Sequence, residues 1–170
     1  MGPIGIFDSG FGGLTVLDAI RKELPEYDYL YLGDNARTPY GTRDFDTVLE
    51  FTWQAVEYLF NKNCSLVILA CNTASAKALR TIQQTRLRKY PGKNVLGVIR
   101  PTTESIQEYT KSNHVGILAT QGTVLSETYP VEIKKFAPNI KVYQQACPLW
   151  VPLIENNEHN SDGGTYFVEE

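Results

Sequence analysis

Cys71 is the residue whose type and position most directly suggest chemistry. It follows the apolar run 66–70 and precedes Asn72 and Thr73, so we expect it at the end of a strand, facing the amino terminus of a helix. Unpaired N–H groups at such a terminus carry partial positive charge and stabilise a thiolate, the form of cysteine that acts as a base or a nucleophile. A buried structural cysteine is the alternative interpretation of this local context.

The other two cysteines lack this setting. Cys64 precedes the apolar run and is predicted to be structural. Cys147 also ends a predicted strand, but Pro148 removes one N–H donor and no hydroxyl or amide cluster follows, so a structural role is favoured there too. Three cysteines and two histidines, without CxxC or metal-ligand spacing, predict neither a disulfide framework nor a metal site.

A glycine-rich turn, 7–13, carries Asp8 and Ser9 after the first apolar run. Its three glycines allow a tight turn and a close approach of the backbone to a ligand. The GxGxxG spacing of a phosphate-binding turn is absent, and the carboxylate of Asp8 would repel phosphate. A plain role for Asp8 as a helix cap or turn former is the alternative.

Further polar groups follow other apolar runs. Those that suit a small anionic ligand are Asn72, Thr73, Thr120 and Thr123. Each of them alone is more often a helix cap than a binding residue. In segment 33–41, Arg37 and the pair Tyr40 and Gly41 could add a guanidinium and a phenol, although Arg37 could equally pair with Asp34.

The elements that must position these residues alternate between short apolar runs and segments of helical period. The predicted strands are 3–7, 27–32, 66–70, 95–99, 115–119 and 142–146. This pattern predicts an α/β fold with a mainly parallel sheet and helices on both faces. In such sheets ligands bind outside the carboxyl ends of the strands, where the polar residues above are found.

Helices are predicted between the strands. Apolar stripes mark one helix from Leu14 to Leu24 and a longer one from Phe45 to Phe60, and a third is expected over 75–89. Pro130 argues against a regular helix after Thr123, because an interior proline loses a hydrogen bond. The tail 156–164 is polar and turn-rich, and 165–168 looks like the opening of a helix.

Composition narrows the class of partner. The chain has 170 residues with 16 Lys+Arg against 19 Asp+Glu, a net charge of −3, which gives no positive field for a phosphate backbone. No apolar run approaches the roughly 20 residues of a membrane span. The N-terminus lacks a charged region followed by an apolar stretch, so we expect no signal peptide. We therefore expect a cytoplasmic chain that binds neither nucleic acid nor membrane.

Six segments together closely resemble glutamate racemase, of the aspartate/glutamate racemase superfamily. In order they are IGIFDSGFGGLTVL (4–17), GDNARTPYG (33–41), LVILACNTASA (66–76), GVIRPT (97–102), GILATQGTVLSETY (116–129) and ACPLWVPLIE (146–155). The resemblance covers essentially the whole chain. It implies two similar α/β domains with glutamate between them, and an isomerase that needs no cofactor. The D-glutamate it makes would supply peptidoglycan synthesis, and hence cell wall biogenesis and cell shape. A homodimer is possible.

The resemblance also implies roles for individual residues. Cys71 would be one of two thiol acid/base residues, assisted by Asp8, and Glu155 matches a carboxylate that assists the opposite base. The positions that match the family's glutamate-holding residues are Asp8, Ser9, Tyr40, Gly41, Asn72, Thr73, Thr120 and Thr123. Racemisation requires one proton to leave Cα and another to arrive on the opposite face, so two such bases are needed.

The second thiol is missing from this sequence. In the family it lies in a GCTHYP-type segment that mirrors ACNTAS, and no such segment occurs here. A faint repeat relates the turn after 3–7 to the turn after 115–119, and its spacing places the mate of Cys71 beyond Glu170. We therefore expect a first domain over 1–99 whose closing part is absent, a truncated second domain over 100–170, and no activity from this piece alone.

Three other functions stay open. A racemase of the same superfamily could act on aspartate or another amino acid, because the sequence does not show the depth of the pocket. The chain could also be a glutamate-binding piece without catalysis. A cysteine hydrolase would need a histidine paired with Cys71, and neither His114 nor His159 follows a predicted strand end.

Overall fold

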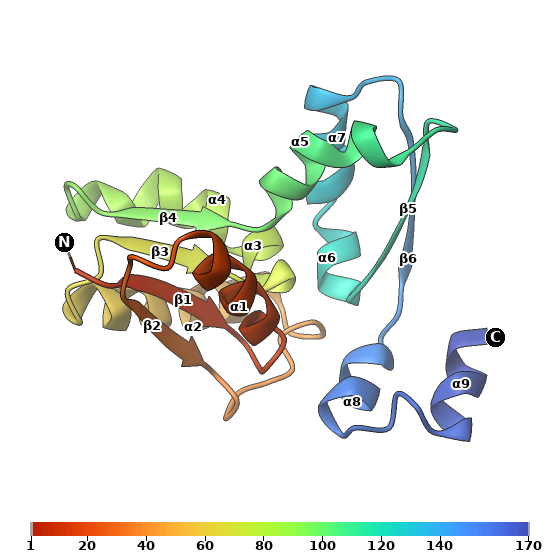
Figure 1. Ribbon diagram of the computed structural model, residues 1–170, viewed down its shortest axis with the longest axis horizontal. Coiled ribbons are helices and arrows are strands. Elements are labelled where there is room, and N and C mark those ends of the chain that lie inside the picture. Colours follow the sequence, from red (N-terminus) through yellow and green to blue (C-terminus); the bar gives the residue numbers. More distant parts are fainter. Residues whose placement is uncertain (1, 170) are drawn as a thin grey trace.

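The first part of the chain forms a four-stranded parallel sheet (Figure 1). The structure, a computed structural model, describes residues 2–169. The strands lie in the order β2-β1-β3-β4. They are β1 (Ile4–Asp8), β2 (Tyr29–Gly33), β3 (Leu66–Leu69) and β4 (Asn94–Gly97). In the central register Ile6 lies opposite Tyr31 on one side and Ile68 on the other, so all four carboxyl ends meet at one edge.

Helices cover both faces of this sheet, as predicted. Alternate residues of β1 point to opposite faces. Ile6 packs beneath α1 (Gly13–Glu23), and Phe7 packs into the larger core beneath α2 (Phe45–Asn61). At the start of α2, Asp44 Oδ1 accepts a hydrogen bond of 2.7 Å from the Thr47 amide.

The third predicted helix begins earlier and is less regular than expected. It begins at Asn72 rather than Ser75, because Cys71 Sγ accepts a hydrogen bond from the Ala74 amide and caps the first turn. The segment then breaks into short pieces. They are α3 (Asn72–Lys77), α4 (Leu79–Thr81), a π-helical turn η1 (Ile82–Arg86) and a 3₁₀ turn η2 (Leu87–Lys89). The Thr85 hydroxyl donates to the Thr81 carbonyl at 2.7 Å, which adds a side-chain bond where the pattern changes.

The second part of the chain is built on a pair of parallel strands (Figure 1). Its elements are α5 (Ile99–Tyr109), β5 (His114–Ala119), α6 (Gln121–Leu125), α7 (Thr128–Phe136) and β6 (Lys141–Ala146). Ile99, predicted to end a strand, instead begins α5, where it is buried with Ile106 and Ile133. These residues cover one face of the pair, while Leu118 and Tyr143 on the other face are 57% and 59% exposed.

The helical region around Pro130 shows why a proline can sit there. Glu127 has a φ of 54°, which ends α6 and separates it from α7. Pro130 is the third residue of α7, where a backbone N–H has no partner within the helix, so the missing donor costs nothing.

Two short helices, α8 (Trp150–Glu155) and α9 (Asp162–Glu169), complete the described chain. The second contains the helical opening expected over 165–168. No described helix is both long and apolar enough to cross a membrane. The six predicted strands are thus confirmed, with ends that shift by one or two residues.

Candidate active site

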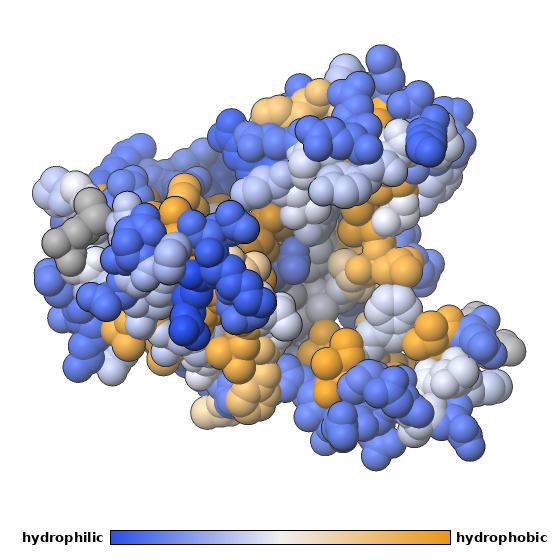
Figure 2. Space-filling model, in the orientation of Figure 1, coloured by the Kyte–Doolittle hydropathy of each residue, from blue (hydrophilic) through white to orange (hydrophobic). Residues whose placement is uncertain are grey.

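A cleft of about 830 Å³ lies at the carboxyl ends of the strands, between the first and second parts of the chain. Figure 2 shows the hollow between the two parts. Its walls come from the turns after β1, β3 and β5 and from α8. Most of the predicted site residues line it. They are Asp8, Ser9, Cys71, Asn72, Thr73, Thr120, Thr123 and Glu155.

Cys71 lies on the wall of this cleft, between β3 and α3, and is 6% exposed. Its Sγ is 3.3 Å from Ser9 Oγ and accepts from the Ala74 amide at 3.4 Å. The strand end and the helix start therefore place the thiol where the sequence predicted it.

The protonation of Cys71 differs from the expectation. Burial, and next the negative charge of Asp8, raise the pKa of the Cys71 thiol above its ordinary value. Hydrogen bonds from Ser9 and from the Ala74 amide oppose this shift without outweighing it. This direction is opposite to the expectation that the helix terminus stabilises a thiolate, because burial favours the neutral thiol.

Asp8 shapes the turn that faces Cys71. The Asp8 side chain is 6% exposed, and its Oδ2 accepts from the amides of Gly10 at 3.2 Å and Gly13 at 2.9 Å. Gly13 has no room for a side chain, since an added Cβ would lie 2.6 Å from Asp8 Cβ. Asp8 is thus the turn former of the plainer interpretation and also a charge beside the thiol.

Three threonine hydroxyls join the two parts of the chain at the cleft. Thr73 Oγ1 lies 2.9 Å from Thr120 Oγ1, which lies 3.1 Å from Thr123 Oγ1. Thr120 also caps α6 by accepting from the Thr123 amide at 3.3 Å. Of the three residues only Thr120 is a helix cap, and all three line the cleft.

Tyr129 was not singled out from the sequence. It comes from α7, lines the cleft, and donates a 2.7 Å hydrogen bond to Asn72 Oδ1. Burial raises the pKa of its phenol, so it remains a donor at neutral pH. Its segment is part of the quoted motif 116–129, but a contact to a residue far back in the chain leaves no local signal.

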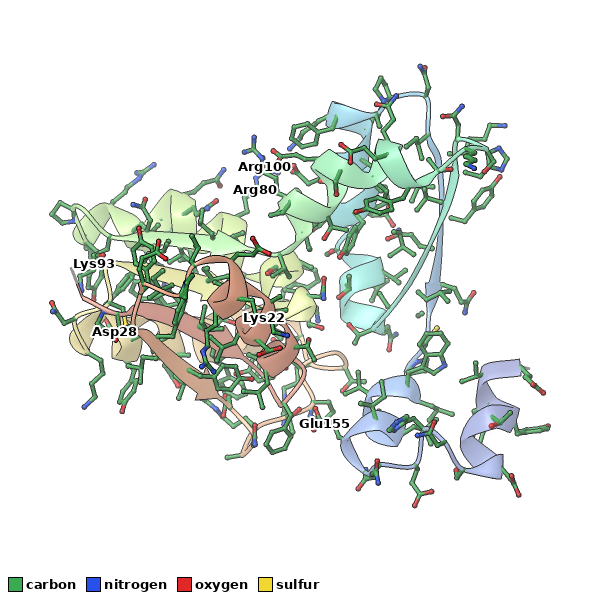
Figure 3. All side chains as sticks on the ribbon, in the orientation of Figure 1. Lys22, Asp28, Arg80, Lys93, Arg100 and Glu155 are labelled. Atoms are coloured by element: carbon green, nitrogen blue, oxygen red, sulfur yellow. The ribbon has the colours of Figure 1, made fainter. Side chains whose placement is uncertain are left out.

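Glu155 is the last residue of α8 and lies on the side of that helix that faces the first sheet (Figure 3). Its carboxylate lies against Gly10, where an added Cβ would be 2.4 Å from Glu155 Oε1. A side chain at Gly10 would therefore displace the end of Glu155, which approaches the same turn that carries Asp8 and Ser9.

Tyr40 and Gly41, the other two residues predicted to hold glutamate, are not among the residues that line the cleft. Tyr40 is 1% exposed, packs on Phe7, and donates its hydroxyl hydrogen to Asp34 Oδ2. Arg37 Nε pairs with the same Asp34 oxygen at 2.6 Å, which is the structural pairing left open by the sequence. The Gly41 carbonyl accepts from the Gly122 amide at 2.8 Å.

The two remaining cysteines occupy different surroundings. Cys64 is fully buried in the core with Val67 and Leu59, as a structural residue would be. Cys147 is half-buried and lines the cleft, a position that its sequence context did not indicate.

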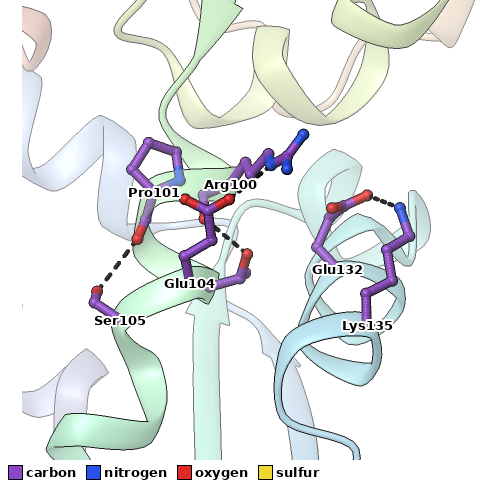
Figure 4. A network of polar contacts seen from close by, with 7 residues as sticks. Arg100, Pro101, Glu104, Ser105, Glu132 and Lys135 are labelled. Atoms are coloured by element: carbon purple, nitrogen blue, oxygen red, sulfur yellow. Dashed lines mark hydrogen bonds and ion pairs between the residues drawn. The ribbon is translucent and has the colours of Figure 1, made fainter.

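A second cleft of about 690 Å³ lies between α4 and the helices α5 and α7. Several of its charged groups are already paired, with Arg100 Nε 2.8 Å from Glu104 Oε1 and Lys135 bound to Glu132 (Figure 4). Within residues 2–169 this cleft has no thiol on its walls, so the first cleft is the candidate active site.

No group of three or more potential metal ligands was found among the described residues. The first cleft is lined by two thiols, Cys71 and Cys147, and Cys71 is the one influenced by the charge of Asp8; a row of hydroxyls and an amide complete the set. Such a set can move a proton at a thiol and can hold a small anionic molecule by neutral hydrogen-bond donors.

The chain is similar to known proteins over nearly its whole length. No family model matches the chain. A glutamate racemase of Geobacter metallireducens is 46% identical over 152 residues, which cover 89% of this chain and 54% of that protein. The crystal structure of a Bacillus anthracis glutamate racemase isoform matches this chain with a TM-score of 0.90 and 34% sequence identity. The crystal structure of Francisella tularensis glutamate racemase in complex with D-glutamate matches with a TM-score of 0.85 and 34% sequence identity. Each structural match covers 99% of this chain and 61% of the other.

The chain spans 54% to 63% of the length of the curated relatives it matches. The similarity in sequence and the similarity in fold both extend over nearly all residues of this chain. The chain therefore belongs to the glutamate racemase family.

Proposed function

We propose that this chain provides one of the two bases of a glutamate racemase, which interconverts L- and D-glutamate by proton transfer at Cα. The observation that carries the proposal is the Cys71 thiol on the wall of the cleft, 3.3 Å from Ser9 Oγ and influenced by the charge of Asp8. The product D-glutamate would serve peptidoglycan synthesis. The relative from Francisella tularensis has D-glutamate bound, which supports glutamate as the substrate.

The proton transfer follows from the state of the thiol. Because burial favours the neutral form, Cys71 is ready to donate its proton to one face of Cα. A thiolate on the opposite face removes the original proton, and the two groups exchange roles in the reverse direction. Asp8 disfavours a negative charge on Cys71, so it favours the protonated thiol and makes the Cys71 thiolate a stronger base in the reverse direction. Glu155 is proposed to assist the opposite base.

The remaining cleft residues have to hold the substrate and stabilise its transition state. Proton loss at Cα builds negative charge that spreads onto the substrate carboxylate, so hydrogen-bond donors around that carboxylate lower the barrier. Thr73, Thr120 and Thr123 provide a row of hydroxyls in the cleft, and Asn72 adds an amide. Tyr40 and Gly41, which the resemblance assigns to glutamate binding, do not line the cleft, and Gly41 contacts Gly122 and Thr120 of this wall. We propose that no cofactor is required.

The proposed mechanism needs a second thiol on the opposite face of Cα. The printed sequence has no GCTHYP-type segment, so residues 1–170 alone should not racemise glutamate. This agrees with a chain that spans about three fifths of its relatives. The domain division at 99/100 belongs to the same proposal, with α5 beginning the second unit.

Racemisation of L-glutamate, followed by circular dichroism, tests the proposal in the intact natural protein. Cys71→Ser should lower turnover by roughly 10²-fold or more, because a hydroxyl is a much weaker acid and base, while glutamate still binds. Cys147→Ser is the matched control, since Cys147 lines the same cleft, and it should retain activity.

Three results would overturn parts of this proposal. Substantial racemisation by Cys71→Ser would remove Cys71 from the mechanism. Racemisation of L-aspartate in preference to L-glutamate would reassign the substrate. Turnover by residues 1–170 alone, with the mass confirmed, would show that the missing second thiol is not needed.

A further inference from the structure

Asn72 is held from one side only. Its side chain is exposed to the cleft, and among the described residues its one side-chain hydrogen bond is the 2.7 Å contact from the Tyr129 hydroxyl to Oδ1. An asparagine amide has one acceptor oxygen and two N–H donors. With Oδ1 turned toward Tyr129, the two Nδ2 hydrogens are the groups left for a bound molecule.

The phenol makes this orientation preferable to the reverse. Tyr129 is 8% exposed, and its hydroxyl hydrogen needs an acceptor because a buried donor without a partner is costly. Asn72 Oδ1 is the acceptor that the structure provides. If the amide were reversed, the phenol would lose that acceptor, and an oxygen would face the cleft where an anionic substrate binds.

The contact also joins the two parts of the chain. Tyr129 belongs to α7, whereas Asn72 is the first residue of α3, directly after Cys71. The neighbouring Thr128 hydroxyl donates to the Ala76 carbonyl at 3.2 Å, so the start of α7 is fixed along α3. The position of the phenol is thus set by packing that does not depend on Asn72.

We infer that Tyr129 is a positioning residue, which orients the Asn72 amide so that its N–H donors face the carboxylate of the substrate. This inference rests on the proposed function and adds a residue that acts through Asn72. This orientation of the Asn72 amide favours a carboxylate, because an amide that presents only N–H donors binds an anion better than a group that itself donates hydrogen bonds.

Tyr129→Phe in the intact protein removes one oxygen and keeps the ring. We expect KM for glutamate to rise roughly 10-fold, the factor for one hydrogen bond, with kcat within about threefold. Tyr90→Phe is the control, because it also removes one phenol hydroxyl, which in this case is hydrogen-bonded to Glu57. Tyr90 packs against the core cluster on the α2 side of the first sheet. This control variant should leave both constants unchanged.

A double-mutant cycle separates positioning from a general structural role. If Tyr129 acts through Asn72, then adding Tyr129→Phe to Asn72→Ala should weaken glutamate binding no further. Full additivity, or unchanged KM in Tyr129→Phe, would overturn the inference. A structural role would instead lower the melting temperature and reduce kcat in both backgrounds.

Nuclear magnetic resonance of the Asn72 side-chain amide gives a readout that needs no substrate. Its Nδ2 resonances should shift and exchange faster with solvent in Tyr129→Phe, but not in Tyr90→Phe. Unchanged resonances would refute the contact itself. If the wild-type protein neither binds nor racemises glutamate, the proposed function fails, and this measurement still decides whether Tyr129 orients Asn72.

Discussion

Replacement of Asp8 by asparagine should have two effects of opposite sign. Asp8 Oδ2 accepts two hydrogen bonds, from the amides of Gly10 and Gly13. A hydrogen bond to a charged group contributes about 1 kcal/mol more than a neutral one, so the loss of charge across two bonds costs about 2 kcal/mol. For a chain of this size that lowers the melting temperature by roughly 4–8 °C.

The same replacement should make Cys71 more reactive. Because the negative charge of Asp8 raises the pKa of the Cys71 thiol, a neutral amide in its place lowers that pKa and increases the thiolate fraction. The rate of iodoacetamide labelling at Cys71, measured by mass spectrometry at fixed pH, should therefore rise. In the intact protein turnover should fall more than affinity, since the Cys71 thiolate becomes a weaker base while the other residues that line the cleft are unchanged.

Asp18→Asn is the matched control for both measurements. Asp18 lies on α1 and forms an exposed pair with Lys22 at 2.7 Å, with a side chain that is 61% exposed. It should change neither the melting temperature nor the labelling rate measurably. Slower labelling of Asp8→Asn would refute the argument, because Asp8 would then stabilise the thiolate rather than oppose it.

Further predictions concern the wall behind the cleft. Gly41→Ala should lower the unfolding free energy by about 1–3 kcal/mol in urea titrations, because the new Cβ would lie 2.7 Å from Thr120 Cβ. Gly116→Ala is the control, because its new Cβ would meet nothing within 4 Å, and it should lower the unfolding free energy far less. A loss of equal size in both variants would contradict this packing. Burial, and then the hydrogen bond to Asp34, raise the pKa of Tyr40 above its ordinary 10.0. The unfolded chain therefore loses this proton at a lower pH than the folded chain, and the unfolding free energy falls as the pH rises above about 10. Urea titrations at pH 7 and pH 10.5 should show a smaller fall for Tyr40→Phe than for the wild type, and equal falls would count against it.

Local pattern was enough to predict the strands of this fold. The run 66–70 is apolar and bounded by polar residues, and it forms β3 almost as expected. The segment 75–89 was harder, because its apolar spacing resembles one helix. The actual breaks depend on hydrogen bonds such as Thr85 to Thr81 and Gln83 to the Val95 carbonyl, which an apolar pattern does not encode.

The candidate site was predictable where residues follow strand ends. Ser9 and Cys71 meet at one edge of the first sheet because its parallel strands end together, and Thr120 follows a strand of the second sheet and lines the same cleft. The protonation of Cys71 was not predictable in the same way, since it depends on burial and on the approach of Asp8 from another strand. The role of Tyr129 was not predictable from the sequence, because its hydrogen-bond partner Asn72 is distant in sequence. The catalytic roles themselves stay predictions.

The backbone hydrogen bond between Gly122 and Gly41 has a practical consequence. The Gly122 amide belongs to the second part of the chain, and its acceptor belongs to the first, at a distance of 2.8 Å. An amide proton exchanges with solvent only when its hydrogen bond opens. The exchange rate of this single proton therefore measures how often the two parts separate, and a ligand that draws them together will slow it without touching either glycine.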